Sequence, residues 1–252
     1  MNVLIFIPGF GKPFYDKKIN WLVKNLFKIT CNTDIMFDIK VCVYDDSDIE
    51  YLKNEISYFT QIRNIDIISD KQIVGNFLKL YCSPSTLIDN YSHILILIDD
   101  IELTSYDINY AIKCIDDFKL DIFSPSLTTD SIYGTPHMFY QKDDFKIRGC
   151  PACELFCYLM PINSYKKYYE HIDSKNPWLW GLDILLYYQF KLVPGISNVI
   201  TMKHHLRNSN KQDTQSFDNY LSGEDGYWYT MNKYNIFNDE PVLKQPPYLF
   251  IK

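Results

Sequence analysis

One stretch of this sequence limits the fold more than any other. Residues 93–98 read His-Ile-Leu-Ile-Leu-Ile and are followed at once by Asp99 and Asp100. A continuous apolar run of this length predicts a strand buried on both faces, because a half-exposed strand would alternate polar and apolar residues. Such strands occupy the centre of parallel sheets covered by helices on both sides. The run therefore predicts an α/β fold with two carboxylates at the carboxyl end of a central strand.

Strand and helix patterns alternate through the first half of the chain. The first strand is predicted at residues 3–7, with a turn at Pro8-Gly9-Phe10-Gly11 ending it. This alternation predicts a mixed, mostly parallel sheet flanked by helices, Rossmann-like in its organisation. The further predicted strands are 37–44, 65–68 and 121–125, and the predicted helices are 18–29, 49–58, 74–81, 84–89 and 105–118.

The second half is less regular. We expect strands at 155–161 and 199–205, and helices at 163–172 and 180–190. No element is predicted in the polar and aromatic tail, residues 208–252. Because no Gly/Ser linker divides the 252 residues, we expect a single domain, 1–252. Its parts are a nucleotide-sugar-binding half (1–125), an acceptor-side half (126–207) and the tail.

Composition excludes several classes of partner. A net charge of −6 provides no electrostatic footprint for nucleic acid or for an anionic membrane. No apolar run approaches the roughly 20 residues of a transmembrane segment. The seven cysteines are an odd number without a signal peptide before them, so we expect reduced thiols and a cytoplasmic protein. Abundant Ile, Asn, Lys and Tyr indicate an AT-rich genome, such as that of a large DNA virus or a protist. For a viral protein, host cytoplasm or virion is the expected location.

The polar residues that follow the predicted strands identify the expected site. In open α/β sheets, ligands bind at the carboxyl ends of the strands, which places residues 9–11, 45–46 and 99–102 on one rim. Adjacent carboxylates repel and are costly to desolvate, and a divalent cation relieves both problems. Carboxylate oxygens suit Mg²⁺ or Mn²⁺, which can also bridge a diphosphate. The alternative is that Asp99 and Asp100 only cap the next helix.

At this point the chain resembles glycosyltransferases of the GT-A fold, whose Asp-x-Asp signature follows an apolar strand. In one register Asp100-Ile101-Glu102 is a variant of that signature. In the other, Ile98-Asp99-Asp100 replaces it. Asp100 is a metal ligand in either register, whereas the roles of Asp99, as a donor-binding residue, and Glu102, as a metal ligand, depend on the register.

Motifs further along the chain carry the same resemblance. They are Asp121-Ile122-Phe123-Ser124-Pro125-Ser126, Leu159-Met160-Pro161, Trp178-Leu179-Trp180-Gly181-Leu182-Asp183 and Met202-Lys203-His204-His205. The apolar-Pro segment followed by Trp-Gly-Leu-Asp is similar to an uncharacterised plant glycosyltransferase-like family. The late histidine of such enzymes can complete the metal site. Because adjacent strand residues point to opposite faces, only one of His204 and His205 is expected to reach the metal.

The resemblance also implies a catalytic base. In inverting enzymes of this fold a carboxylate near Asp183 deprotonates the acceptor hydroxyl. The alternative for Asp183 is a carboxylate at a helix N-terminus, stabilised by the helix dipole. Glu154 is the rival base.

The remaining candidate residues each have a structural alternative. Pro8, Gly9, Phe10 and Gly11 bring the backbone close to a nucleotide or form an ordinary turn. Asp45 and Asp46 are expected to bind the ribose or the base. The alternative is that they belong to a capping cluster, residues 45–48, at the start of the next helix. Trp178 and Trp180 stack on an acceptor sugar or pack in the core. Lys79 is assigned to the donor and Arg148 to the acceptor, and a solvated side chain is the alternative for both.

Together these residues predict a metal-dependent glycosyltransferase. It would move a sugar from a nucleotide-diphosphate donor to a hydroxyl of a glycan, protein or small molecule, with inversion. One alternative is a metal-dependent nucleotidyltransferase or phosphotransferase, which would use the same carboxylates. The other is a non-catalytic carbohydrate-binding or virion structural protein, which would need no acidic rim.

Overall fold

The computed structural model describes residues 1–11, 15–46, 49–132, 134–141, 145–205, 223–236 and 249–251. Its strands form one sheet in the order β10-β7-β9-β6-β8-β4-β1-β2-β3, with β5 paired to β9 beside this path. The strands are β1 (Asn2–Phe10), β2 (Met36–Val43), β3 (Ile62–Ser69), β4 (His93–Leu97), β5 (Ile101–Leu103), β6 (Ile122–Leu127), β7 (Ile147–Gly149), β8 (Cys157–Pro161), β9 (Pro194–His204) and β10 (Leu249–Ile251).

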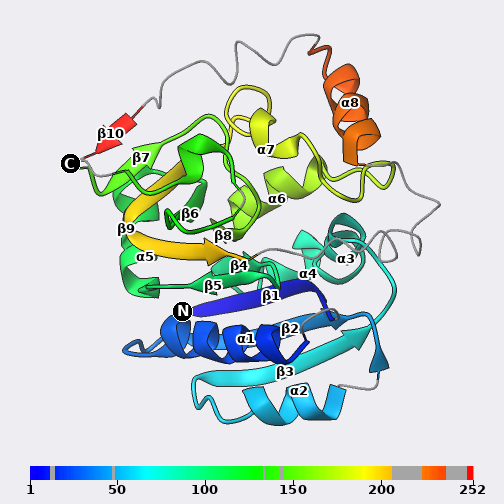
Figure 1. Ribbon diagram of the computed structural model, residues 1–252, viewed down its shortest axis with the longest axis vertical. Coiled ribbons are helices and arrows are strands. Elements are labelled where there is room, and N and C mark those ends of the chain that lie inside the picture. Colours follow the sequence, from blue (N-terminus) through cyan, green and yellow to red (C-terminus); the bar gives the residue numbers. More distant parts are fainter. Residues whose placement is uncertain are drawn as a thin grey trace.

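Helices lie along the sheet, as Figure 1 shows. In that view α1 and α2 lie beside β1, β2 and β3, whereas α6 and α7 lie beside β6, β8 and β9. The helices are α1 (Tyr15–Thr30), α2 (Ile49–Ile56), α3 (Val74–Tyr81), α4 (Pro84–Leu87), α5 (Ile108–Phe118), α6 (Ile162–Glu170), α7 (Leu182–Leu185) and α8 (Gly223–Lys233), with the 3₁₀ turn η2 (Pro136–Met138).

The strand directions confirm the predicted mixed, mostly parallel sheet. Strand β1 pairs in parallel with β2 and β4, and β2 pairs in parallel with β3. Strand β8 runs antiparallel to both β4 and β6, and β6 is parallel to β9. Strands β1, β2, β3, β4, β6 and β9 therefore all point the same way. The order β3-β2-β1-β4 is that of a Rossmann-like half, and it places their carboxyl ends on one rim.

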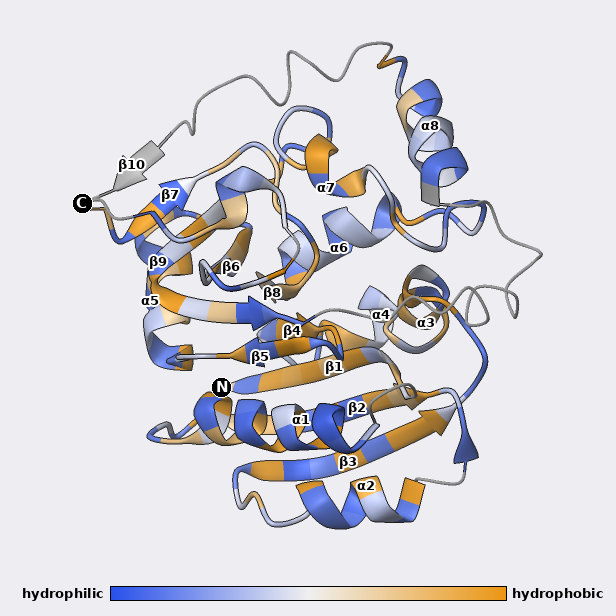
Figure 2. Cartoon of the chain, in the orientation of Figure 1, coloured by the Kyte–Doolittle hydropathy of each residue, from blue (hydrophilic) through white to orange (hydrophobic). Residues whose placement is uncertain are grey.

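Burial explains why β1 and β4 lie at the centre. All five residues of β4 are buried, and β1 is buried from Val3 to Phe10. Both strands are apolar along almost their whole length in Figure 2, whereas the edge strand β3 is only partly buried. Among the described helices, none is long and apolar enough to span a membrane.

Several predicted boundaries are wrong, and each error has a physical cause. Strand β1 continues through Pro8 and Gly9 to Phe10, because a register shift between Ile7 and Phe10 accommodates them as a bulge. Strand β9 begins at Pro194, five residues before the predicted start. Helix α5 begins after Asp107, whose side chain accepts a hydrogen bond from the Tyr110 N–H at 3.0 Å, so residues 105–107 precede it.

The second half contains elements that the sequence pattern does not predict. Strands β5 and β7 have three residues each, too few to display a period. The predicted helix at 180–190 is confined to α7, which has four residues. The tail contributes α8 and β10. Residues 47 and 48 of the predicted cap, and the rest of the tail, lie outside the described residues.

Candidate active site

Strand β4 delivers Asp99 and Asp100 to the carboxyl rim of the sheet. Both are buried, at 7% and 3% exposure. Lys18 of α1, itself buried, donates to Asp99 Oδ2 at 2.6 Å and to the Gly11 carbonyl at 2.7 Å. This ion pair joins α1 to the end of β1 and to the residue after β4. Asp99, predicted to bind the donor, thus has a lysine as its counter-ion.

Strand β5 carries Glu102 to the same rim. It pairs antiparallel with the end of β9, with Ile101 opposite His204 and Glu102 opposite Lys203. Its other edge is held by the buried Asn25 of α1, which donates to the Ile101 carbonyl and accepts from the Leu103 N–H, both at 2.8 Å. Because both edges of β5 are bonded, the position of Glu102 is fixed by β9 and α1 together.

His204, the last residue of β9, and His205, which follows it, lie against different carboxylates. His204 Nε2 is 3.4 Å from Asp100 Oδ2, and His205 Nε2 is 3.0 Å from Glu102 Oε2. The His205 N–H also donates to the Asp100 carbonyl at 3.1 Å. Opposite-facing neighbours on a strand explain why each imidazole meets its own acid.

An aromatic ring packs on each imidazole. Trp21 of α1 stacks on His205 with ring centroids 3.9 Å apart and an interplanar angle of 11°. Phe156 lies against His204 with centroids 4.6 Å apart. These rings restrict the orientation of both histidines, so the Nε2 atoms are held towards the acids.

Glu154 and Asp183, the two predicted bases, lie near enough for the charge of Glu154 to act on Asp183. Glu154 is buried, and its Oε2 accepts hydrogen bonds from the N–H and the hydroxyl of Thr135 at 2.7 and 3.0 Å. Burial raises the pKa of Glu154, although these bonds and the nearby His204 partly offset the shift. Burial, and next the negative charge of Glu154, raise the pKa of Asp183 to about 7.

These interactions join the two halves of the predicted site. Glu154 is within electrostatic reach of both Asp183 and His204, and His204 contacts Asp100. The Cys153 N–H also donates to the Asp183 carbonyl at 3.2 Å. The metal candidates and the base candidates therefore occupy one continuous region.

The glycines at the end of β1 accommodate a tyrosine. Gly9 has φ +86°, a conformation that favours glycine, and a Cβ there would collide with the Tyr44 hydroxyl. A Cβ on Gly11 would lie 3.0 Å from Tyr44 Cδ2. Pro8 and Phe10, predicted with them to bind the donor, are buried. The close approach that these glycines permit is to the Tyr44 ring.

Asp45 and Asp46 follow β2 and are exposed at the carboxyl rim, as expected for groups that could meet a nucleotide. Trp178 is half-buried and Trp180 is 46% exposed, and both lie in the segment that leads to Asp183. These four residues occupy positions accessible to ligand.

Two predicted binding residues have structural partners instead. Arg148 is 2% exposed, and its guanidinium donates to the His137 and Phe139 carbonyls at 3.2 and 2.8 Å. Lys79 of α3 donates to the Tyr169 carbonyl at 3.2 Å and lies 4.2 Å from the centre of the Tyr169 ring. Arg148 thus holds the turn at η2, and Lys79 joins α3 to α6.

The metal candidates form two acid–imidazole pairs. Within the described residues, no group of three or more His, Cys, Asp or Glu side chains is placed to hold a metal ion. The pairs Asp100–His204 and Glu102–His205 nevertheless offer oxygen and nitrogen donors of the kind that bind Mn²⁺. Magnesium and manganese commonly take only one or two carboxylates from the protein and complete their coordination with substrate phosphates.

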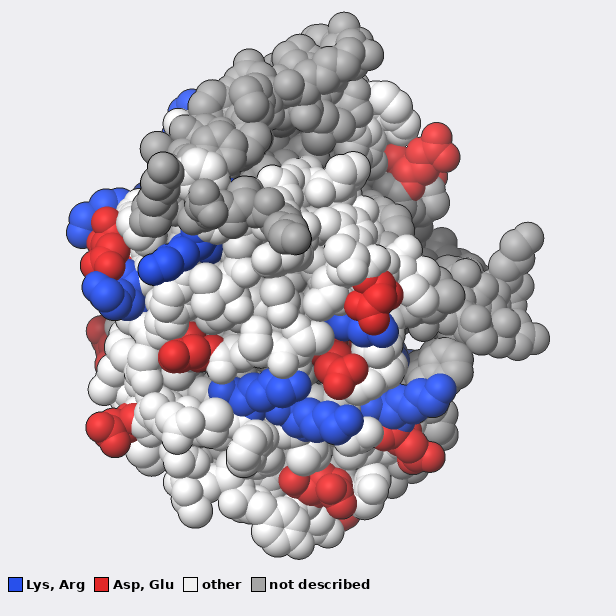
Figure 3. Space-filling view, turned by 60° about the vertical axis from the view of Figure 1, so that its left-hand side comes forward, with Lys and Arg blue, Asp and Glu red and all other residues white. Residues whose placement is uncertain are grey.

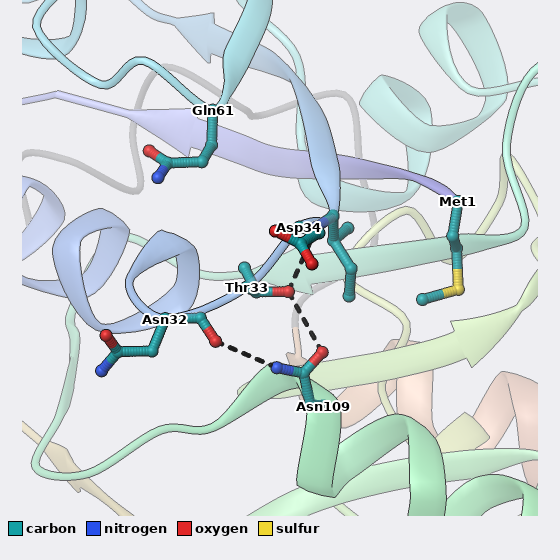
Figure 4. A pocket seen from close by; sticks show the side chains of 7 residues that line it. Met1, Asn32, Thr33, Asp34, Gln61 and Asn109 are labelled. Carbon is teal, nitrogen blue, oxygen red and sulfur yellow. Dashed lines mark hydrogen bonds between the residues drawn. The ribbon is translucent and has the colours of Figure 1, made fainter.

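A separate hollow lies away from this rim. A hollow of about 500 Å³ opens at the amino ends of β2 and β3, lined by Met1, Asn32, Thr33, Asp34, Ile35, Gln61 and Asn109 (Figure 4). Its amide and hydroxyl groups bond to one another: Asn109 donates to the Asn32 carbonyl at 3.2 Å and accepts from Thr33 at 3.1 Å. None of the predicted site residues lines it. We favour the carboxyl rim because the acid–imidazole pairs lie there, together with Glu154 and Asp183, the two carboxyls whose pKa values are raised.

The surface carries no extended field of one sign on the face that Figure 3 shows. Basic side chains form a short row there, and acidic side chains lie on both sides of it. All seven cysteines are free thiols, and burial raises the pKa of Cys150 and Cys153.

Four residues of the site are absent from the sequence-based prediction: Lys18, Trp21, Tyr44 and Phe156. Lys18 and Trp21 look like ordinary positions of an amphipathic helix. Their partners Asp99 and His205 are distant in sequence, so only tertiary contacts identify them. For Tyr44 a signal exists, since glycines at positions 9 and 11 indicate close approach by some group.

No family model and no curated protein matches the sequence. Solved structures with a related shape include A197 from STIV, at 15% identity and a TM-score of 0.46, covering 82% of this chain and 87% of that one. Another is a "putative nucleotide-diphospho-sugar transferase" from Desulfovibrio desulfuricans G20, at 9% identity and a TM-score of 0.48, covering 93% and 95%. Both TM-scores are below 0.5, so we draw no conclusion from these likenesses.

Proposed function

We propose that this chain is a metal-dependent glycosyltransferase that takes a sugar from a nucleotide-diphosphate donor. The observation that carries the proposal is the convergence on one rim of Asp100 and Glu102, their histidines, and the coupled carboxyls of Glu154 and Asp183. The rim lies at the carboxyl ends of parallel strands, where nucleotides bind in folds of this type. A purely structural protein has no need to gather so many buried and half-buried acids at one place.

The donor diphosphate is expected to bind through Mn²⁺ or Mg²⁺. Asp100, Glu102 and one of His204 and His205 would hold the ion, since their donor atoms suit it. When bound, the ion would neutralise the charge on the departing diphosphate. Asp99 would contribute indirectly, because its charge is already balanced by Lys18.

The acceptor hydroxyl is expected to lose its proton to Asp183. A general base works best with a pKa near the operating pH, and burial with Glu154 raises the pKa of Asp183 to about 7. Glu154 accepts two hydrogen bonds from Thr135, which stabilise its charged form in place. We therefore assign proton acceptance to Asp183, with inversion, and treat Glu154 as the neighbour that sets its pKa.

Trp178 and Trp180 are proposed to stack on the acceptor, which would be a glycan, a protein or a small molecule with a free hydroxyl. Trp180 exposes nearly half of its surface three residues before Asp183. The free state of the seven thiols fits the cytoplasm as the place of action.

Ligand-dependent stabilisation tests the proposal. A thermal-shift screen would use uridine, guanosine and adenosine diphosphates and their sugar conjugates, each with and without Mn²⁺. We expect at least one of these compounds to raise the melting temperature of the protein only when Mn²⁺ is present. Asp100→Ala should abolish that shift and the release of nucleoside diphosphate, whereas Glu50→Gln, an exposed acid of α2, should retain both.

The products separate the rival chemistry. A glycosyltransferase releases a nucleoside diphosphate, whereas a nucleotidyltransferase releases pyrophosphate or a nucleoside monophosphate. Full activity of Asp100→Ala in EDTA would reject metal dependence, and pyrophosphate as the product would reject glycosyl transfer.

A further inference from the structure

The segment that ends in Asp183 has a costly backbone conformation. Within residues 173–183, Leu179 and Gly181 both have positive φ, 62° and 81°. For leucine this conformation is unfavourable and persists only where surrounding contacts impose it. Local hydrogen bonds contribute: the Leu179 N–H donates to the Asn176 carbonyl and the Leu182 N–H to the Leu179 carbonyl, both at 3.1 Å.

Asn176 links this segment to α8. Its side chain is 2% exposed, and Nδ2 donates both to the Trp180 carbonyl at 2.8 Å and to the Thr230 hydroxyl at 2.7 Å. One amide group therefore joins the residue before Gly181 to the helix of the tail. A buried amide with both donor bonds satisfied has little freedom to rotate.

Two glycines bring α8 and the segment into close contact. A Cβ on Gly226 of α8 would lie 2.6 Å from Asn176 Oδ1, and a Cβ on Gly181 would lie 2.9 Å from Met231 Cε. Glycine is unfavourable inside a helix, so its presence at position 226 has a packing reason. The helix sits where only a hydrogen atom fits against Asn176.

Asp173 forms a second link between the segment and α8. Its Oδ2 accepts hydrogen bonds from Tyr229 at 2.9 Å and from Lys233 at 2.8 Å. Burial alone would raise the pKa of Asp173, but the bonds from Lys233, the Lys175 N–H and Tyr229 outweigh it and lower the pKa to about 2. The link is therefore ionic throughout the neutral range. In Figure 1, α8 stands beside the chain between α6 and α7.

We propose that α8 is a positioning element for the base Asp183, with Asn176 as the positioning residue that transmits its support through the Trp180 carbonyl. This rests on the proposed function for the role of Asp183 but concerns contacts that are independent of it. If α8 is displaced, Asn176 loses its bond to Thr230 and Gly181 loses its packing against Met231, and the half-buried Asp183 side chain becomes more exposed to water. Because burial is the largest cause of the raised pKa of Asp183, that pKa should fall.

Two variants perturb the contact in different ways. Gly226→Ala places a methyl group against Asn176 Oδ1, and Thr230→Val removes the hydroxyl that accepts from Asn176 while keeping the side-chain shape. Asn232→Ala, an exposed position of the same helix, is the matched control. If Gly226→Ala does not fold, Thr230→Val still tests whether the contact between α8 and Asn176 affects Asp183.

Carboxyl NMR of the full chain labelled in aspartate measures the pKa of Asp183 directly, and hydrogen exchange follows the amides of residues 179–183. We expect the pKa of Asp183 to fall by about one unit or more in Gly226→Ala and Thr230→Val, with faster exchange of those amides, and no change in Asn232→Ala. For transfer, kcat should fall about 10- to 100-fold with the donor KM unchanged, as expected for a misplaced catalytic group.

An unchanged pKa of Asp183 and unchanged exchange at 179–183, in folded variants whose α8 amides exchange faster, would overturn the inference. The NMR and exchange results need no transferase activity. The absence of metal-dependent donor binding would therefore contradict the proposed function and leave this inference to be decided by its own measurements.

Discussion

The buried pair of Lys18 and Asp99 offers a sharp energetic test. Lys18→Met keeps much of the side-chain length but removes the cation that contacts Asp99 Oδ2 at 2.6 Å. The two side chains are only 7% and 2% exposed, so water cannot replace the lost ammonium. Removing one member of a buried ion pair costs about 3–5 kcal/mol, because the other charge is left without compensation.

Two further losses act in the same direction. The Gly11 carbonyl loses the hydrogen bond that it accepts from Lys18 at 2.7 Å, and the contact between α1 and the end of β1 loosens. We therefore expect the free energy of unfolding of Lys18→Met to fall by about 3–5 kcal/mol. Lys24→Met, at an exposed lysine of the same helix, should change it by less than about 0.5 kcal/mol.

Urea unfolding followed by circular dichroism measures these differences, provided that the m-values agree. The double variant Lys18→Met/Asp99→Asn separates lost charge from lost packing. Because it removes both charges, it should be more stable than Lys18→Met alone, with a coupling energy of about 1–3 kcal/mol. A loss below about 1 kcal/mol in Lys18→Met, or strict additivity in the double variant, would refute the buried-pair reasoning.

Three other predictions follow from the rim. The pKa of Asp183 is about 7 in the folded protein and 3.8 in the unfolded chain. Between these pH values the unfolded chain loses the proton first, so the stability of the wild type should fall as the pH rises from about 4 to about 7. Asp183→Asn should lack this decline and should be more stable than the wild type at pH 8 in urea unfolding. Its kcat should be lower by about 10²–10⁴-fold. If the free energy of unfolding fell equally steeply with pH in both proteins, the assignment would be contradicted. Glu154→Gln removes the charge that is the second cause of the shift, so the pKa of Asp183 measured by carboxyl NMR should fall, and an unchanged value would exclude coupling. Gly9→Ala should cost at least about 1–2 kcal/mol for its φ of +86° alone, and Tyr44→Ala in the same chain should recover only the steric part; a neutral Gly9→Ala would contradict the bulge.

The sequence predicts the central part of the fold because local patterns suffice there. The short apolar run at 93–98 predicts a strand buried on both faces, and residues 93–97 form β4. The placement of Asp100 at its carboxyl end follows directly. Strand β5 could not be predicted in this way, because its three residues become a strand only by pairing with β9, about a hundred positions later.

The candidate site was predictable in its residue types but not in its contacts. Glu154 and Asp183 are rival bases by sequence, whereas in the structure the charge of Glu154 acts on Asp183. Arg148 has the appearance of a ligand-binding cation, yet two backbone carbonyls hold it inside the protein. The role of α8 was invisible, because a polar, aromatic helix gains its stability from Asp173 and Asn176, which are far away in sequence.

Paramagnetic broadening by Mn²⁺ tests the central claim most directly. The chain has five histidines, and with ¹⁵N-labelled imidazoles they serve as probes at separate places. His204 and His205 lie at the acidic rim, whereas His93 begins β4 at the opposite end and His171 contacts Tyr234 after α8. When Mn²⁺ is titrated in the presence of a nucleoside diphosphate, the signals of His204 and His205 should broaden first and those of His93 and His171 should persist. Persistence of the His204 and His205 signals, or broadening of His93 before them, would contradict a metal–diphosphate site at this rim.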